Sequence, residues 1–314
     1  MVIQAIELGK DFELEAPIPN PTKSEAFYPR DQILWTINGA YRPRIKMYPG
    51  EVQRWRILNA AEGKLASLRL NGHQLSAIAW DGLTLDAPEP ADDTLLFPAN
   101  RVDVLVKAGG HGVYDLVLSP GSSQKPHVPG MPEPVQPPGS NGTVSGELVP
   151  RTIATIEVVG TGDEMFLPDE LPAYAPEMLP VARTRDVAYT VHRLEDGEFI
   201  SFGVNGQHFD PERDPYTMQL NTAEEWTITN GADQGFVHVF HIHVNPFLVT
   251  KINGVPVEKP FWRDTYVVGP NLGDSFTCVM NLTDFTGTFV QHCHVLTHED
   301  LGMMEALRIV EGEP

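Results

Sequence analysis

The chain has 314 residues, with 28 prolines, 27 glycines and a formal net charge of −20 at pH 7. This length is enough for two domains, each with a full hydrophobic core. The strong negative charge argues against nucleic acid and anionic membrane surfaces as partners. No run of apolar residues is long enough to span a bilayer, so we expect no membrane span.

Short runs rich in Val, Ile, Thr and Phe recur between turn signals, which is typical of an all-β sandwich or barrel. In chain order, these predicted strands include Gln32–Ile37, Gln53–Leu58, Arg101–Lys107, Trp226–Thr229 and Gly287–Val290. The segment Ser119–Val149 is rich in Pro, Gly and Ser, which predicts a long surface excursion and linker. We therefore place a domain boundary near residue 150.

A weak internal repeat predicts two similar domains, residues 1–150 and 151–314. In both halves an Asn-Gly pair precedes a strand that contains Trp and ends in Asn: Asn38-Gly39 with Trp55–Asn59, and Asn205-Gly206 with Trp226–Asn230. Further along, Leu68–His73 falls where His238–His243 falls, and Gly112–Leu118 falls where Gly287–Cys293 falls.

On this register, Val117 and Leu118 occupy the positions of His292 and Cys293, so metal ligands are expected only in the second domain. His73 is then interpreted as a structural histidine. Four other histidines have no partner at metal-ligand spacing, and we interpret them as loop or surface residues: His111, His127, His192 and His208.

Two short blocks near the C-terminus hold six of the 11 histidines and one of the 2 cysteines. They read His238-Val-Phe-His241-Ile-His243 and His292-Cys293-His294-Val-Leu-Thr-His298-Glu-Asp-Leu-Gly-Met303. One thiolate, two imidazoles and a weak axial thioether suit a blue copper ion. Cys293, His298 and Met303 would supply three of these ligands, and a histidine of the upstream block the fourth.

Strand geometry sorts these side chains onto two surfaces, because successive residues of a strand point to opposite faces. One surface carries His238 and Cys293, to which His298 and Met303 return from the following loop. The other surface carries four imidazoles: His241, His243, His292 and His294. The pattern predicts a metal site on each side of two neighbouring strands. If Cys293 binds copper, no internal disulfide can form and Cys278 is a core thiol.

The two blocks resemble the upstream and terminal copper blocks of the multicopper oxidases, a family that includes laccases, bilirubin oxidases and cuprous oxidases. The resemblance implies cupredoxin-like Greek-key β-sandwiches, with residues 1–150 similar to a metal-free middle domain and 151–314 similar to the last domain. It implies a type 1 copper site at His238, Cys293, His298 and Met303. It also implies that His241 ligates a type 2 copper, and that the type 3 pair is held by His243, His292 and His294.

One departure from the family pattern concerns the trinuclear cluster. The family binds this cluster with eight histidines, four of which come from two more His-x-His pairs in an N-terminal domain. Beyond His241-Ile-His243 and His292-Cys-His294, this sequence contains no such pairs. Short two-domain family members carry histidine pairs in their first domain, and residues 1–150 do not. We therefore expect a complete type 1 site and half a trinuclear site. Either the first cupredoxin domain was lost, or it is a separate chain, or the protein does without it.

The resemblance implies a laccase-like copper oxidoreductase that oxidises phenolic, aromatic or metal-ion substrates by single electrons and reduces O₂ to water. Electrons would arrive through an exposed edge of His298 or His238 and cross Cys293 to His292 and His294. Glu299 would relay protons or hold its loop by hydrogen bonds. The sequence has no methionine-rich insert, which favours organic substrates.

Two alternatives stay open: a non-enzymatic type 1 electron-transfer or copper-binding protein, and a structural relative that kept the fold. The resemblance implies a periplasmic or extracellular location.

Overall fold

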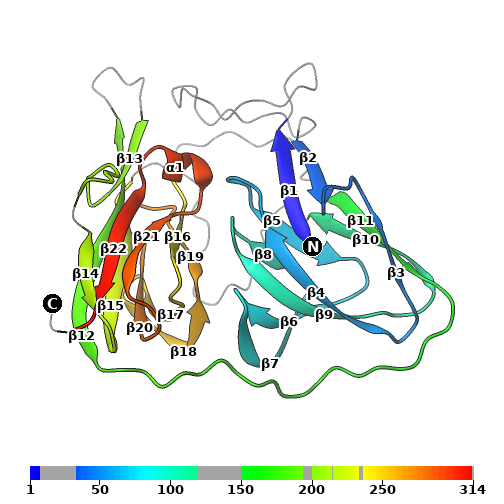
Figure 1. Cartoon of the computed structure of the whole chain (residues 1–314). Coiled ribbons are helices and arrows are strands. Elements are labelled where there is room, and N and C mark those ends of the chain that lie inside the picture. The colour runs from blue at the N-terminus through cyan, green and yellow to red at the C-terminus, as the bar shows by residue number, and fades with distance from the viewer. Residues whose placement is uncertain (8–32, 119–149, 194–199, 214, 233–235, 313–314) are drawn as a thin grey trace. The chain divides into compact units, whose positions relative to one another are not determined.

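The computed structural model describes residues 1–7, 33–118, 150–193, 200–213, 215–232 and 236–312. These residues form β-strands and one short helix, and they fall into two compact units (Figure 1). The all-β prediction is therefore confirmed. In the described ranges, no helix is both long and apolar enough to cross a membrane. The proposed excursion at Ser119–Val149 and the surface interpretation of His127 lie outside the described residues.

The first unit is built from a six-stranded sheet, β2-β1-β4-β9-β6-β7, and a five-stranded sheet, β3-β11-β10-β5-β8. Consecutive strands change sheet repeatedly, as in Greek-key sandwiches. The strand bounds are β1 Val2–Glu7, β2 Ile33–Ile37, β3 Arg44–Met47, β4 Val52–Asn59, β5 Ala66–Leu70, β6 Leu75–Trp80, β7 Leu83–Ala91, β8 Thr94–Leu96, β9 Arg101–Lys107, β10 Gly112–Leu118 and β11 Arg151–Val158.

The second unit repeats this order in the sheets β13-β12-β15-β20-β17-β18 and β14-β22-β21-β16-β19. Its bounds are β12 Val181–Arg193, β13 Ile200–Val204, β14 Tyr216–Gln219, β15 Thr222–Asn230, β16 His238–Ile242, β17 Phe247–Ile252, β18 Val255–Arg263, β19 Thr265–Val268, β20 Ser275–Leu282, β21 Gly287–Cys293, α1 Leu296–Asp300 and β22 Met304–Val310. Strand for strand, the two units share one topology, so the predicted internal repeat is confirmed.

Alternating side chains explain why these segments form sandwiches. In β4, Trp55 and Ile57 are buried while Arg54 and Arg56 are exposed, so one face of the strand joins the core. The Asn-Gly pairs take positive φ angles, for example 52° at Asn38, which suits tight turns between strands.

The cross-strand register corrects the alignment of the repeat. Leu118 pairs with Leu68 in the first unit as Cys293 pairs with Phe240 in the second. Leu118 therefore does occupy the position of Cys293, but the upstream match was displaced by two residues. Ala66 takes the position of His238 and is fully buried.

The domain boundary also lies further along the chain than residue 150. Strand β11 pairs with β10 and β3, so it belongs to the first sandwich. The described part of the first unit continues to Tyr174, and the second unit takes over at Ala175. The Pro-rich segment thus connects two adjacent strands of one sheet and does not separate the domains.

The imidazole of His73 has structural contacts in the first unit. Its Nδ1 lies 3.0 Å from the carbonyl oxygen of Asn71, and the Gly109 N–H donates to its Nε2 at 3.1 Å. Its ring meets the Tyr114 ring edge-to-face, with centroids 4.4 Å apart. The predicted surface positions of His111, His192 and His208 are confirmed, since all three side chains are exposed.

We expect the substitution His73→Ala to destabilise the first unit by about 1–2 kcal/mol, because Gly109 N–H and Asn71 C=O lose a partner. Copper content and visible spectrum should not change. Urea unfolding and metal analysis of the purified variant check both statements. Loss of one copper per chain would show that the first unit binds metal.

Tyr266 of β19 makes stability depend on alkaline pH. Burial raises the pKa of its phenol from 10.0 to about 12. Between these values the unfolded chain loses the proton and the folded chain keeps it. Stability is therefore fully present below pH 10 and falls as pH rises, by about 1.4 kcal/mol per pH unit. Buried Tyr189, Cys278 and Cys293, whose pKa values are also raised, add to the total slope that urea unfolding measures between pH 9 and 11. Tyr266→Phe should therefore reduce the total slope by about 1.4 kcal/mol per pH unit, while Tyr41→Phe, at an exposed position, should leave it unchanged.

Candidate metal centre

Strands β16 and β21 lie side by side in the five-stranded sheet and carry half of the predicted ligands, and His243 and His294 directly follow them. His241 is directly opposite His292, and Phe240 is opposite Cys293. Beyond the ladder, His294 N–H donates to the Val239 carbonyl at 2.7 Å and His243 N–H donates to the Val290 carbonyl at 3.1 Å. The antiparallel pairing of β16 with β21 thus continues beyond both ends of the ladder. Alternate residues of the two strands face opposite surfaces of the sheet.

The inner face holds the first cluster, made of His238, Cys293 and His298. The Nδ1 atoms of the two histidines are 3.1 Å apart. Cys293 Sγ lies 3.8 Å from Nδ1 of His238 and 3.6 Å from Nδ1 of His298. The three side chains are almost completely buried, with exposed fractions of 0%, 0% and 3%. One thiol and two imidazole nitrogens therefore converge on one point inside the sandwich.

Burial favours the neutral forms of His238 and Cys293. It lowers the pKa of His238 well below 6.5, and the neighbouring His298 lowers it further. Burial also raises the pKa of the Cys293 thiol to about 12. The Val239 N–H nevertheless points at the sulfur, 3.4 Å away. Neutral imidazole is the form that binds metals, and a bound metal ion would displace the thiol proton.

These donors fit a copper ion. Both imidazoles present Nδ1 to the sulfur, and Nε2 of His238 has no hydrogen-bond partner among the described residues. Nδ1 is therefore the nitrogen of each ring that is placed to bind a metal together with the sulfur. A buried set of one sulfur and two nitrogens is the donor chemistry of blue copper sites.

The loop between β21 and β22 returns His298 and Met303 to the inner face. His298 lies in α1, and Met303 is fully buried. The Met303 N–H donates to the His298 carbonyl, and its own carbonyl accepts from the Cys293 N–H, both at 3.0 Å. Gly302 makes the return with a φ of 106°, and a Cβ there would collide with the ring of His208.

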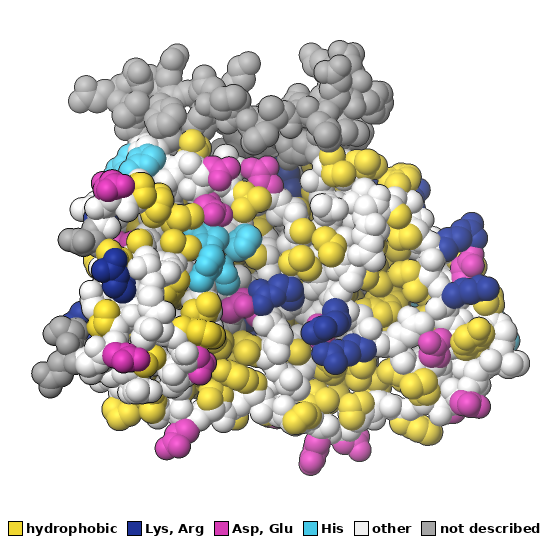
Figure 2. Space-filling view, viewed as in Figure 1, with side chains coloured by type: hydrophobic (Ala, Val, Ile, Leu, Met, Phe, Trp, Pro, Cys, Tyr) yellow, Lys and Arg dark blue, Asp and Glu magenta, His cyan; other side chains and the backbone are white. Residues whose placement is uncertain are grey.

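The outer face holds the second cluster, in which one nitrogen each of His241, His243 and His292 lie within 4.8 Å of one another. The fourth imidazole, His294, is close by, with its ring centroid 5.2 Å from that of His292 and 5.5 Å from that of His241. Histidine side chains gather at the molecular surface in Figure 2. His243 is exposed, and His241 and His294 are partly exposed.

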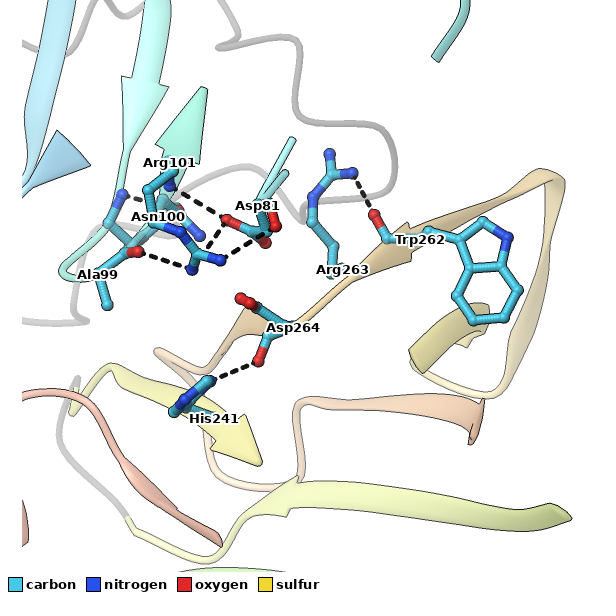
Figure 3. A network of polar contacts seen from close by, with 9 residues as sticks. Asp81, Ala99, Asn100, Arg101, His241, Trp262, Arg263 and Asp264 are labelled. Carbon is cyan, nitrogen blue, oxygen red and sulfur yellow. Dashed lines mark hydrogen bonds and ion pairs between the residues drawn. The ribbon is translucent and has the colours of Figure 1, made fainter. Parts of the chain in front are cut away.

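Two imidazoles of this second cluster are oriented by hydrogen bonds at Nδ1. His241 Nδ1 lies 2.7 Å from the main-chain carbonyl of Asp264, as Figure 3 shows. His292 Nδ1 lies 3.1 Å from the Cys293 carbonyl and 3.2 Å from a carboxylate oxygen of Glu299. If both Nδ1 atoms donate, both Nε2 atoms are left for a metal. Such bonds fix the tautomer and ring orientation of metal ligands.

Glu299 therefore contacts the imidazole of His292. Its carboxyl group is raised in pKa by burial and by the neighbouring Asp300, and its side chain is 22% exposed. Burial and the surrounding imidazoles lower the pKa of His292 to about 3 despite this contact. The contact is that of a neutral N–H donating to a carboxyl oxygen.

Sequence reasoning missed several residues around the first cluster. The Tyr189 hydroxyl donates to Gln291 Oε1 at 2.9 Å inside the core, and the Tyr189 ring meets that of His238 edge-to-face at 5.6 Å. Phe202 and Phe236 stack on His298 and His238. Only Gln291 and Phe236 stand near the motif blocks in sequence, so spacing offered no signal for Tyr189 or Phe202.

One expectation is wrong in detail. Electron transfer was expected through an exposed edge of His298 or His238, but these side chains are 3% and 0% exposed. Phe202 lies parallel to the His298 ring and Phe236 lies parallel to the His238 ring.

The first unit has different chemistry at the equivalent positions. Ala66 and Leu118 stand where His238 and Cys293 stand, and Val117 where His292 stands. Arg69 takes the position of His241 and forms an ion pair with Asp93. Both groups of clustered potential ligands found in the described ranges lie in the second unit.

Fold and site together define an all-β protein with two repeated sandwiches and one thiol–imidazole centre of the copper type. Sequence profiles of the multicopper oxidase family match residues 18–132 and 178–313. The structure resembles a multicopper oxidase from Campylobacter jejuni described as a metallo-oxidase, with a TM-score of 0.76 and 25% identity, over 99% of this chain and 63% of that one. The chain belongs to the multicopper oxidase family, and its units are cupredoxin-like sandwiches.

Three curated relatives show the range of the family. The chain is 25% identical to the multicopper oxidase mco of Staphylococcus haemolyticus, over 92% of this chain and 54% of that protein. It is 25% identical to the laccase of Bacillus subtilis, over 94% and 57%. It is also 31% identical to the cell division protein FtsP of Dickeya dadantii, over 80% and 48%. The chain thus spans about half the length of these relatives.

Proposed function

We propose that this protein is a laccase-like copper oxidoreductase that oxidises its substrates by single electrons and reduces O₂ to water. The observation that carries the proposal is the convergence of Cys293 Sγ with Nδ1 of His238 and of His298 on one face of β16 and β21. Four imidazoles occupy the opposite face of the same two strands. A structural role alone would not require buried thiol and imidazole groups facing one another.

The residues divide into two proposed ligand sets. His238, Cys293, His298 and Met303 would hold a type 1 copper. His241 would hold the type 2 copper, and His243, His292 and His294 would contribute to the type 3 pair. Bound copper would supply one-electron redox chemistry at the first set and O₂ reduction at the second.

The protein's own contribution is positioning and connection. Cys293 lies between His292 and His294 in the chain, so the main chain joins the two sets by a few covalent bonds. The Asp264 carbonyl and the Glu299 carboxylate hold the rings of His241 and His292. The pKa of the Glu299 carboxyl group is raised, and its side chain is partly exposed. We propose that Glu299 also passes protons from solvent toward the outer face.

The second set needs further ligands. Within these 314 residues it has four imidazoles, whereas the family's trinuclear cluster uses eight. We propose that an N-terminal cupredoxin domain with two His-x-His pairs, in the same protein or as a separate chain, supplies the other four. By family resemblance the protein would work in the periplasm or outside the cell.

A second candidate is a non-enzymatic type 1 copper protein. Its support is the contrast between the two clusters, because the thiol and imidazoles of the first are buried while the second is partly exposed. The similarity to a cell division protein shows that relatives of this chain do not all carry an oxidase's name.

Copper stoichiometry measured together with oxygen uptake separates the two candidates. The oxidase proposal expects one tightly held blue copper per chain, weaker copper at the outer face, and oxygen consumption once the outer face is completed. A chain that binds one copper and never consumes oxygen, even with a first domain present, would favour the electron-transfer protein. Absence of any blue copper would contradict both.

A further inference from the structure

Two phenylalanine rings lie against the imidazoles of the first cluster. Phe202, in β13, stacks on His298 with ring centroids 4.2 Å apart and an interplanar angle of 19°. Phe236, two residues before His238, lies parallel to the His238 ring at 6.3 Å and 7°. The two phenylalanines meet edge-to-face at 6.0 Å, and Phe236 also meets the His298 ring at 6.1 Å. Each ring of this group thus contacts at least two others.

The group is anchored by the main chain of the ligand loop. The Phe202 N–H points at the Leu301 carbonyl at 3.4 Å, and the Phe209 N–H donates to the Gly302 carbonyl at 3.0 Å. Leu301 and Gly302 immediately precede Met303. The position of Phe202 on His298 is therefore tied to the same loop that delivers the ligands.

Exposure distinguishes the two phenylalanines. Phe202 is 4% exposed, and His238 and His298 are buried, but Phe236 is partly exposed. Phe236 thus keeps part of its surface in contact with solvent, whereas both imidazoles are buried. The Tyr189 ring also contacts the His238 ring, edge-to-face at 5.6 Å.

We propose that Phe202 and Phe236 form an aromatic wall that excludes water and coordinating anions from His238 and His298, and that Phe236 is the contact surface for the reductant. The proposal rests on the proposed function, because it concerns electrons delivered to that cluster. The wall favours flat aromatic reductants, since aromatic rings gain from stacking on one another. Hydrated metal ions have no comparable contact.

The step involves electron transfer without bond formation to the protein. A phenol in contact with Phe236 gives up one electron and releases its hydroxyl proton to water, leaving a phenoxyl radical. A copper(II) ion held by the first cluster would take up this electron. The imidazoles do not have to leave the metal or meet the phenol.

Chemical labelling of the metal-free chain tests the wall without relying on copper. Diethyl pyrocarbonate acylates accessible neutral imidazoles, and His192 and His208, which are exposed, serve as internal references. We expect His238 and His298 to react at least about tenfold more slowly than these references in the native chain. Phe236→Ala should speed labelling of His238, and Phe202→Ala that of His298. Phe202→Leu keeps the core filled if the alanine variant does not fold.

The matched control is Phe261→Ala, because Phe261 is also partly buried and in contact with an aromatic ring, that of Tyr266. It should leave labelling of His238 and His298 unchanged. Native labelling of these two histidines as fast as that of His208 would overturn the wall. So would a folded Phe236→Ala variant, judged by circular dichroism, in which His238 stays protected.

Anaerobic reduction of the copper-loaded chain tests the contact surface. The rate at which hydroquinone bleaches the blue band is compared with the rate for hexaammineruthenium(II), which is not aromatic. Phe236→Ala should lower the ratio of these two rates by about tenfold, and Phe261→Ala should not. An unchanged ratio would overturn the role of Phe236. If the labelling pattern appears but no blue band forms, the wall is supported and the proposed function fails.

Discussion

Replacing Cys293 with serine is expected to abolish the blue absorption of the copper-loaded chain. The band arises from charge transfer between a thiolate and copper(II), and a serine hydroxyl is a hard donor that gives no such transition. Cys293 Sγ is the sulfur that lies within 4 Å of both ligand imidazoles, at 3.8 Å and 3.6 Å. Loss of this ligand should also weaken copper binding. Titration with copper(II), followed by visible absorption, measures both effects.

Cys278 provides the control for this experiment. It lies in β20 opposite Trp226, in the other sheet of the second unit, and is fully buried. Burial raises the pKa of its thiol well above 9.0, which keeps it protonated and unreactive. Cys278→Ala should therefore retain the blue band at full intensity. A band that survives Cys293→Ser, or disappears in Cys278→Ala, would contradict the assignment of the sulfur ligand.

The two faces of the metal centre could be predicted from sequence because strand parity is a geometric property. His241 and His292 differ in parity from His238 and Cys293, and the register places them on opposite faces, as the alternation requires. The ligand loop was also readable, because Cys293, His298 and Met303 lie within one short block. Both inferences needed local sequence alone.

Residues that support the centre could not be predicted in this way. The Asp264 group that orients His241 is a main-chain carbonyl, which any residue would offer. Phe202 reaches His298 from a strand almost a hundred residues upstream, through the packing of one sheet on the other. Such contacts depend on the tertiary fold and leave no periodic pattern.

The predicted domain boundary and the predicted alignment of the repeat differ from the structure for a related reason. Composition predicted a linker at residues 119–149, but only the pairing of β10 with β11 shows that the strands before and after these residues belong to one sheet. The repeat was aligned on the Asn-Gly-His run ending at His73, which belongs to a turn. Pairing of Leu68 with Leu118 fixes the correct register, with Ala66 at the position of His238.

Oxygen uptake by the copper-loaded chain is expected to be absent or very slow until four further imidazoles are supplied. The outer face offers His241, His243, His292 and His294, which is half the number that the family uses for three copper ions. Metal affinity depends on the number of ligands and on the groups that orient them. Copper at this face should therefore be weakly held. The first cluster on the inner face, whose donor groups are buried, should be fully occupied by copper.

Adding a first cupredoxin domain from a homologous oxidase, fused or as a separate chain, should raise copper content and start oxygen consumption. The double substitution His241→Ala/His243→Ala should remove this gain and leave the blue band intact, because both residues point away from Cys293. The added domain alone is the blank, and an oxygen electrode with metal analysis gives the readout. Three or four tightly held copper ions and sustained oxygen uptake by the chain alone would contradict the prediction that the outer face has only half of the ligands it needs. They would point instead to completion of the cluster by a second copy of this chain.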